Sequence, residues 1–283
     1  MTADAASLAA LITWSASHIV GVFASSLVLL LLGVAGVWQL LRRYGVHRAG
    51  SRFSQANYRA AYLGGAMALV ASATGFFVAL AHNLGTGQSL VLLDQQIAQT
   101  LGTTLSAPTF RLFSVLTHLG DPWVLMVLSA VVALSLCALR RYQLCAGWVL
   151  ATGGNAMLNP LLKNIFQRVR PVHEVTLASG WSFPSGHASG SLVVYGMLAY
   201  LLMRWLPARW SRVSLPLVLL AATLAFTVSC SRVLLQVHFA SDVLGGLASG
   251  TAWLTLCITA MEVVHHRQTT SASRAGSGLD QAG

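Results

Sequence analysis

Long apolar runs alternate along the chain with short polar or basic segments, and each apolar run has about the length of a membrane-spanning helix. The hydrocarbon core of a bilayer requires a helix of about 20 predominantly apolar residues. Seven segments satisfy this requirement: 19–41, 60–81, 122–139, 143–162, 187–203, 213–229 and 242–264. The pattern therefore predicts an all-α fold, a polytopic bundle of six to seven transmembrane helices that forms a single integral-membrane domain over residues 1–283.

The segments outside the predicted spans differ in composition. Residues 1–18 are moderately apolar, so we expect an interfacial helix there rather than a span. Residues 82–121 are too polar to cross a membrane and predict an extracytoplasmic loop, in which 90–98 and 110–116 form short surface helices. The last residues, 268–283, are rich in Ser, Gly and Ala. This composition predicts a disordered cytoplasmic tail.

The composition favours membrane insertion over a soluble or nucleic-acid-binding protein. Of the 283 residues, 55% are hydrophobic and only 8% are charged, whereas about a quarter of the residues in a soluble domain are charged. The net charge of +10 comes from Arg residues scattered between the apolar runs. This is the pattern of orientation signals, so we expect no nucleic-acid partner. The four cysteines lie inside apolar runs without paired spacing, which disfavours a disulfide framework or a zinc site.

The basic residues also predict the orientation of the bundle. With the predicted spans as boundaries, twelve fall on one side: Arg42, Arg43, Arg48, Arg52, Arg59, Arg140, Arg141, Arg204, Arg209, Arg212, Arg267 and Arg274. Five fall on the other side: Arg111, Lys163, Arg168, Arg170 and Arg232. Cytoplasmic loops are enriched in Lys and Arg, so we expect the first side and the C-terminus to be cytoplasmic. Four of the five remaining cations belong to the clusters described next, which should face away from the cytoplasm.

The segment K-N-I-F-Q-R-V-R-P, residues 163–171, follows the fourth predicted span and interrupts an otherwise apolar sequence. It contains Lys163, which is the only lysine of the chain. Lys163 and Arg170 are about two helical turns apart, so both project from one helix face. Ionisable groups at this depth usually pair, line a wet cavity or bind a ligand. Taken alone, the two cations are also explained as anchors of a helix end at the membrane surface.

Two further clusters follow on the same predicted side of the membrane. P-S-G-H at 184–187 opens the next apolar run, and a helix N-terminus offers free backbone N–H groups to an anion. The third cluster contains Arg232, His238 and Asp242; the carboxylate lies one helical turn after the histidine, so it can hold one ring nitrogen and leave the other free. His187 has no acid at matching spacing, which suits it to be a general acid. Alone, each cluster also has a structural explanation, as a helix cap or as a structural ion pair.

Together, the clusters have the composition of a phosphoryl-transfer site. Cleavage of a phosphate ester requires positive charge at the phosphoryl oxygens, an aligned nucleophile and a proton for the leaving oxygen. Arginine supplies bidentate donors and lysine a point charge, while Ser185 and Gly186 offer a hydroxyl and backbone N–H groups. The outward-facing acids are far apart in sequence, so we expect neither a metal site nor a cofactor: Asp94, Asp121, Glu174 and Asp242.

The three clusters, in this order, resemble the signature motifs of the type 2 phosphatidic-acid phosphatase superfamily. The matching segments are K-N-I-F-Q-R-V-R-P (163–171), P-S-G-H (184–187) and S-R-V-L-L-Q-V-H-F-A-S-D (231–242). The resemblance covers the C-terminal half of the chain, from the fourth predicted span to the seventh. It implies a six-helix phosphatase core. Because we predict seven spans, either the first is an addition to this core or one of the seven is not a span.

The resemblance also implies a role for each matching residue. His238 forms a phosphohistidine, Asp242 orients His238, and His187 protonates the leaving group. The family works without a metal ion. The residues that would bind the phosphate are Lys163, Arg170, Ser185, Gly186 and Arg232.

We therefore expect a lipid phosphatase on the periplasmic face of a bacterial inner membrane, with a lipid phosphate as substrate and membrane lipids around it. The resemblance implies substrates such as undecaprenyl diphosphate, phosphatidylglycerol phosphate, phosphatidic acid or lipid A phosphates. A phosphotransferase remains an alternative, since an alcohol can attack a phosphohistidine as water does. A transporter of phosphorylated lipids is another, since it would use the same cations without turnover. The loops 82–121 and 172–183, expected to contact the headgroup, carry no motif that selects one lipid.

Overall fold

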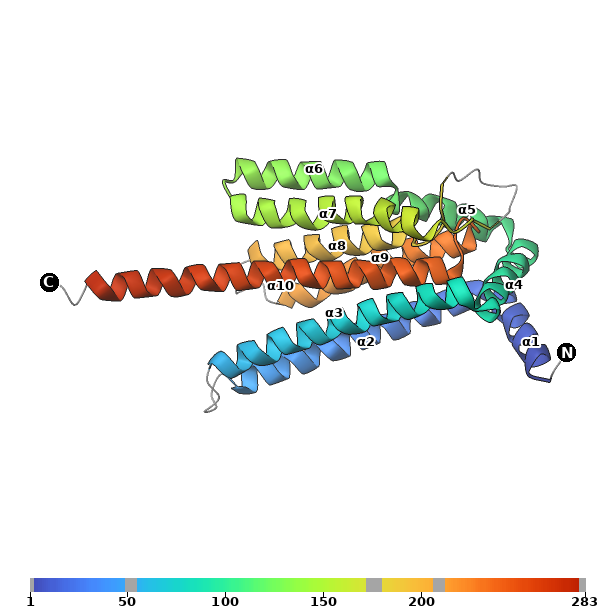
Figure 1. Ribbon diagram of the computed structural model, residues 1–283, viewed down its shortest axis with the longest axis horizontal. Helices are drawn as coiled ribbons and strands as arrows, with labels where there is room; N and C mark the ends of the chain where they lie inside the picture. Colours follow the sequence, from blue (N-terminus) through green and yellow to red (C-terminus); the bar gives the residue numbers. More distant parts are fainter. Residues whose placement is uncertain (1–2, 49–54, 172–179, 206–211, 280–283) are drawn as a thin grey trace.

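The computed structural model describes residues 3–48, 55–171, 180–205 and 212–279, and this part of the chain is almost entirely helical (Figure 1). No strand occurs in these four ranges, so the predicted all-α fold is confirmed. In chain order the helices are α1 (Ala3–Ser17), α2 (Ile19–Arg48), α3 (Gln55–Thr86), α4 (Gln88–Thr104), α5 (Ala107–Leu116), the 3₁₀ helix η1 (Thr117–Gly120), α6 (Pro122–Ala138), α7 (Tyr142–Phe166), α8 (Gly186–Trp205), α9 (Ser214–Leu234) and α10 (Ala240–Leu279).

The long helices lie alongside one another as a bundle (Figure 1). Within the described ranges, six stretches are long and apolar enough to cross a membrane: Ile19–Arg43, Arg59–Thr86, Ala107–Ala138, Gly186–Trp205, Ser214–Leu234 and Ala240–Gln268. The remaining predicted span, 143–162, coincides with α7. Asn155 and Asn159 lower the hydropathy of α7, but the helix packs against both α6 and α8. The bundle therefore has the six to seven spans that the sequence predicts.

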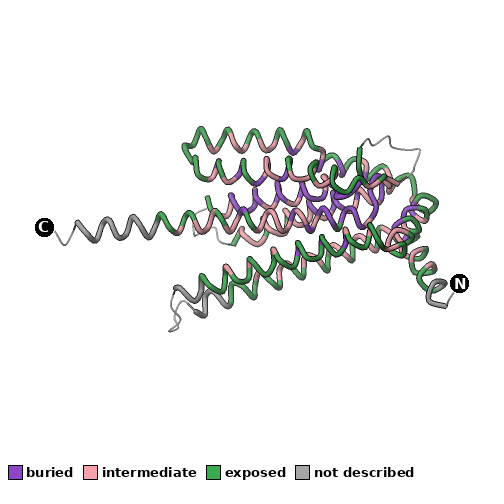
Figure 2. Tube along the Cα trace, viewed as in Figure 1, coloured by how far each residue is buried: buried purple, intermediate pink, exposed green. Residues whose placement is uncertain are grey.

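The core of the bundle lies around α8. This helix contacts α6, α7, α9 and α10, and buried residues recur along most of its length. Figure 2 shows that burial is concentrated in α8, α9 and the first half of α10, whereas α2, α3 and α6 are largely exposed. Many exposed residues of these outer helices are large and apolar, as in Leu29, Leu32 and Leu134. Such surfaces are expected on helices that face lipid rather than water.

Glycine allows the beginning of α10 to lie directly against the segment that leads into α8. A Cβ atom on Gly246 would lie only 2.4 Å from Ser185 O, and one on Gly250 would lie 3.1 Å from Ser189 Cα. Small residues let helix backbones approach closely in membranes. The contact is completed by a backbone hydrogen bond from Ser185 N to Asp242 O, at 2.9 Å. Two segments that are distant in sequence are thereby held in one layer.

The polar segments gather at the two ends of the bundle. The end of α2, the start of α3, the α6–α7 connection, the end of α8, the start of α9 and the C-terminal end of α10 lie at one end (Figure 1). Helices α4 and α5 and the starts of α8 and α10 lie at the other end. Ten of the twelve arginines assigned to one side belong to the first end; the other two, Arg52 and Arg209, fall outside the described residues. The five remaining cations belong to the second end.

The segments expected outside the membrane are also helical. Residues 82–121 contain α4, α5 and η1, so the predicted short helices are present and longer than expected. Helix α1 packs against α4. Helix α10 continues to Leu279, which differs from the disordered tail expected over 268–283. Thr, Ser and Gly predominate in this segment and are weak helix formers, so the sequence gives no local reason for the continued helix. The loop segment 172–179, with Glu174, lies outside the described residues.

Candidate active site

The three predicted clusters come from different elements and meet at one end of the bundle. Lys163 lies in the last turn of α7, after which Gln167 adopts a left-handed conformation with φ 46° and ends the helix. The following backbone is fixed by Ser182, which is fully buried and whose side chain donates to the carbonyls of Arg168 and Val169, at 3.1 Å each. This connection turns the basic segment back over the starts of α8 and α10.

His238 lies between a cation and a carboxylate. Arg170 Nη1 is 3.2 Å from His238 Nε2, and Asp242 Oδ2 is 3.4 Å from His238 Nδ1. A guanidinium has only donors and a carboxylate only acceptors. Nε2 therefore accepts from Arg170, and the ring proton lies on Nδ1, toward Asp242. Asp242 is itself held by the backbone N–H of Phe239, which donates to Oδ2 at 2.9 Å.

Burial keeps the His238 ring neutral. The side chain is 2% exposed, and this desolvation lowers its pKa to about 4, against the opposing effect of the Asp242 carboxylate. The cations Arg170 and Arg232 act in the same direction as burial. A neutral imidazole with its proton on Nδ1 keeps a lone pair on Nε2, which is the requirement for a nucleophile.

The other predicted cations surround His238 from three elements. Lys163 Nζ donates to Trp181 O at 2.8 Å, while Arg170 donates to Gly180 O at 3.0 Å and to Val237 O at 2.6 Å. Burial lowers the pKa of the Arg170 guanidinium, and the Asp242 carboxylate opposes the shift. These carbonyls fix the direction of each long side chain. The result is a concentration of positive charge next to a neutral histidine.

Arg232 and Ser185 retain hydrogen-bonding atoms without partners. Arg232 Nη1 donates to Thr117 Oγ1 of η1 at 2.8 Å. Within the described chain, Arg232 Nε and Ser185 Oγ are buried atoms that make no hydrogen bond. Most buried polar atoms in proteins are paired, so these two atoms are candidates for contact with an anionic ligand. A Cβ atom on Gly186 would lie 2.8 Å from Asn159 Oδ1, so a larger residue there would displace the Asn159 side chain.

His187 has a carboxylate partner that the sequence analysis missed. The expectation that no acid supports His187 was based on local spacing and is wrong: His187 Nε2 is 3.0 Å from Asp121 Oδ1. Asp121 also accepts from His118 Nδ1 at 2.7 Å. The sequence feature that could have indicated this contact is the position of Asp121. It immediately precedes the proline at the start of the third predicted span, on the same predicted side of the membrane as His187.

Arg168 and Asp94 are a second pair to which the sequence assigned no role. Arg168 Nη1 lies 2.6 Å from Asp242 Oδ1, and Arg168 Nη2 lies 2.8 Å from Asp94 Oδ2. The outward-facing acids Asp94 and Asp242, distant in sequence, are thus joined through one guanidinium. Arg168 is therefore an ion-paired residue, unlike Lys163, which donates to a backbone carbonyl, and Arg170, which donates to backbone carbonyls and to His238.

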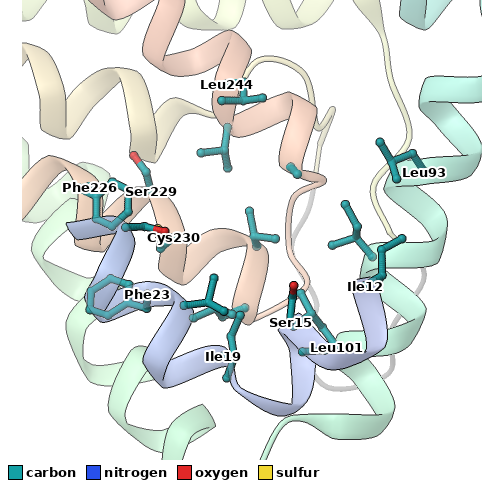
Figure 3. A pocket seen from close by; sticks show the side chains of 18 of the residues that line it. Ile12, Ser15, Ile19, Phe23, Leu93, Leu101, Phe226, Ser229, Cys230 and Leu244 are labelled. Carbon is teal, nitrogen blue, oxygen red and sulfur yellow. The ribbon is translucent and has the colours of Figure 1, made fainter. Parts of the chain in front are cut away.

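Two cavities lie near this end of the bundle, and they differ in polarity. One, of about 550 Å³, is bordered by Arg168, Arg170, Gln95 and Phe239 and adjoins the cationic cluster. The other, of about 530 Å³, is almost wholly apolar and lies between α1, α2, α4, α9 and α10 (Figure 3). None of the eight predicted site residues, all of them described, lines the apolar cavity. Of these eight residues, Arg170 lines the first cavity.

Comparison with known proteins places these motifs in a family. The model of the PAP2 superfamily matches residues 142–265. Phosphatidylglycerophosphatase B of Bacillus subtilis (strain 168) is 36% identical over 140 residues, which cover 48% of this chain and 66% of that protein. Decaprenylphosphoryl-5-phosphoribose phosphatase of Mycobacterium tuberculosis is 32% identical over 146 residues, covering 48% and 71%.

A solved structure has the same architecture. The crystal structure of a transmembrane PAP2-type phosphatidylglycerolphosphate phosphatase from Bacillus subtilis superposes with a TM-score of 0.65 at 29% sequence identity. The match covers 69% of this chain and 96% of the solved chain. Almost all of the solved protein therefore has a counterpart here, while about a third of this chain lies outside the match.

Proposed function

The chain belongs to the PAP2 superfamily of integral-membrane lipid phosphatases, and from this premise we propose that it hydrolyses a lipid phosphate or diphosphate without a metal ion, through a phosphohistidine. The observation that carries the proposal is the position of His238 Nε2, 3.2 Å from Arg170 Nη1. A phosphoryl group that took the Arg170 hydrogen bond would lie next to the Nε2 lone pair, which would then be free to attack it. His187, the other histidine of the site, has the Asp121 carboxylate at Nε2 instead of an arginine.

In the first step, His238 Nε2 attacks phosphorus and the bond between phosphorus and the lipid oxygen breaks. Asp242 faces the N–H at Nδ1 and stabilises the positive charge that the ring acquires as the N–P bond forms. Lys163, Arg170 and Arg232 stabilise the negative charge on the phosphoryl oxygens. Ser185 Oγ and the backbone at Gly186 complete the phosphate site in this proposal.

His187 gives a proton to the leaving lipid oxygen, and in the second step it takes a proton from the water that attacks the phosphohistidine. Because Asp121 is an acceptor only, Nε2 of His187 carries a hydrogen toward it. Nδ1 is then the nitrogen that exchanges a proton with the reacting oxygen. Water displaces His238 from phosphorus, which releases inorganic phosphate and restores the neutral ring.

The substrate that we propose is a phosphate group at the end of a lipid headgroup. Phosphatidylglycerol phosphate is the first candidate, because both the curated Bacillus relative and the solved structure have it in their names. Undecaprenyl diphosphate and phosphatidic acid are the other candidates, since each presents a terminal phosphate at the end of an apolar tail. The cavity of about 550 Å³ bordered by Arg170 has room for such a headgroup.

We further propose that the site faces the periplasm of a bacterial inner membrane and that the C-terminus is cytoplasmic. The support is the distribution of basic residues: among the described residues, ten arginines belong to the end of the bundle opposite the site, against five cations at the site's own end. The positive-inside bias then assigns the arginine-rich end to the cytoplasm.

The test is phosphate release by the purified protein from phosphatidylglycerol phosphate, phosphatidic acid and undecaprenyl diphosphate in detergent micelles, with His238→Ala as the inactive control. We expect release that persists in a chelator and is blocked by vanadate, which resembles a five-coordinate phosphoryl group. Binding without release would indicate a transporter, and transfer of phosphate to an added alcohol without release would indicate a phosphotransferase. Loss in chelator with recovery on addition of Mg²⁺ would refute the metal-free mechanism.

A further inference from the structure

One guanidinium, that of Arg168, joins two buried carboxylates from different helices. Nη1 contacts Asp242 at the start of α10, and Nη2 contacts Asp94 in the middle of α4. Each carboxylate is 74 residues from Arg168 in the chain. Asp242 is 0% exposed and Asp94 2% exposed. A buried ion pair is held in place only where its geometry is good and its remaining groups are hydrogen-bonded, so the rest of this network is informative.

Ser241, the residue before Asp242, forms hydrogen bonds with both Asp94 and Arg168. Its hydroxyl donates to Asp94 Oδ2 and accepts from Arg168 Nη1, the latter at 2.7 Å. Its backbone N–H donates to Asp94 Oδ1 at 3.2 Å. Asp94 is therefore bound to the first turn of α10, which begins at Ala240 and contains Asp242. Asp94 thus holds both the Arg168 guanidinium, which contacts Asp242, and the backbone from which the Asp242 side chain projects.

The guanidinium cannot easily leave this position. Its carbon lies 4.3 Å from the centroid of the Phe239 ring, a cation–π contact. The carbonyl of Arg168 accepts hydrogen bonds from Ser182. The side chain is only 14% exposed. Because its two terminal nitrogens already donate to carboxylates, Arg168 differs from Lys163, Arg170 and Arg232 and is not a natural phosphate ligand.

We propose that Asp94 and Arg168 are positioning residues for the nucleophile: they hold the Asp242 carboxylate in the orientation in which it faces the N–H of His238. This inference rests on the proposed function. It assigns a role in the reaction to a residue of α4, which lies outside the part of the chain that matches the family model, residues 142–265.

The two carboxylate oxygens of Asp242 have different partners, and this explains how the network acts. Oδ1 is bound to Arg168, and Oδ2 faces His238 and accepts from the backbone of Phe239. A carboxylate fixed at one oxygen cannot rotate the other away from the histidine. Without Asp94, Arg168 keeps one carboxylate partner and its full charge acts on Asp242, which weakens the carboxylate's interaction with the His238 N–H. A displacement of about 1 Å in such a group can cost about 100-fold in rate.

The experiment compares Asp94→Asn with Glu262→Gln in purified, detergent-solubilised protein. Glu262 is a matched control, because it also joins two helices, through Tyr200 at 2.8 Å and Arg204 at 3.5 Å, but lies in the half of α10 remote from the site. The assays are phosphate release from phosphatidic acid micelles, the rate of phosphoenzyme formation in a rapid quench, the Kd for inorganic phosphate, and thermal unfolding.

For Asp94→Asn we expect kcat and the rate of phosphoenzyme formation to fall about 100-fold, with KM and the Kd for inorganic phosphate within about threefold of wild type. Arg168→Lys keeps the charge without the fork and should show the same pattern. Asp94→Glu keeps the carboxylate and should recover part of the loss. Glu262→Gln should shift the melting temperature to a similar extent and keep kcat.

Three results would overturn the proposal. The first is a kcat of Asp94→Asn within about twofold of wild type, and the second is an equal loss in affinity for inorganic phosphate. The third is no recovery with Asp94→Glu in a protein that melts as wild type does. A wild-type protein that releases no phosphate from any of the lipids would instead refute the proposed function, so the two failures are distinguishable.

Discussion

Asp121 Oδ1 lies 3.0 Å from His187 Nε2 across 66 residues of the chain. Each of the two histidines of the site therefore has its own carboxylate, Asp121 for His187 and Asp242 for His238. The presence of an acid cannot by itself assign the nucleophile. The assignment made here depends instead on burial and on Arg170, which contacts the ring nitrogen of His238 opposite Asp242.

Removal of the Asp121 carboxylate should affect substrates according to their leaving group. A lipid alkoxide needs a proton as it departs, whereas nitrophenolate does not. General acid catalysis contributes about 10²- to 10⁴-fold, and Asp121→Asn should remove part of this, about 10- to 100-fold in kcat on phosphatidic acid. The loss on 4-nitrophenyl phosphate should be less than about fivefold.

The matched control for Asp121 is His118→Ala. His118 is the other partner of Asp121, and its side chain is 66% exposed. This variant should retain nearly full activity on both substrates. An equal loss of Asp121→Asn activity on both substrates would show that Asp121 does not act through leaving-group protonation.

Comparison of the same two substrates, a lipid phosphate and 4-nitrophenyl phosphate, should distinguish the roles of His238 and His187. His238→Ala removes the nucleophile and should abolish activity on both the lipid and the activated ester. His187→Ala should lose about 10²- to 10⁴-fold on the lipid and recover much of the loss on 4-nitrophenyl phosphate. Quenching the wild-type reaction in base should trap an acid-labile phosphoenzyme. Phosphate found on His187, or rescue of His238→Ala alone by the activated ester, would reverse the two roles.

The His238 ring should become protonated only at acidic pH, below the usual range for histidine. Burial lowers its pKa from an ordinary value of 6.5 to about 4. In the window between these values the unfolded chain binds a proton that the folded chain does not, so the contribution of His238 to stability is complete above about pH 6.5 and is lost as the pH falls toward 4. In ¹⁵N-histidine NMR spectra, the His238 ring should remain neutral at pH 5.5.

The variant Asp242→Asn tests the direction in which the Asp242 carboxylate shifts the pKa of His238. The carboxylate raises the pKa of His238, so its removal should lower that pKa further and leave the ring neutral to a more acidic pH. A His238 signal that titrates at or above pH 6.5 in the wild type, or an upward shift in Asp242→Asn, would contradict the electrostatic arrangement described for the site.

The orientation of the bundle is testable by cysteine labelling in a cysteine-free background. Gln99→Cys in α4 lies at the end of the bundle that carries the site, and Gln143→Cys at the start of α7 lies at the opposite end (Figure 1). Both side chains are exposed. An impermeant thiol reagent added to intact cells should label position 99 and leave position 143 unlabelled until lysis. The reverse pattern would place the site in the cytoplasm.

The sequence by itself determined the fold class and the position of the chemistry. Apolar runs of about 20 residues predict membrane helices because a bilayer core has a fixed thickness, and the all-α bundle is confirmed. Three motifs containing Lys163, His187 and His238 identified the family. The residues of each motif are close together in the sequence, so their spacing can be read without knowledge of the fold. The His238–Asp242 relation was accessible for the same reason, since four residues make one helical turn.

Only the tertiary structure decided which partners these residues have. Asp121 meets His187, and Arg168 joins Asp94 to Asp242, through contacts between elements separated by 66 to 74 residues. No periodicity in a helix relates such positions, because their proximity depends on how α4, η1 and α10 pack at one end of the bundle. Close packing at glycines such as Gly246 sets that arrangement, and it places isolated carboxylates of the sequence beside the histidine and arginine that they hold.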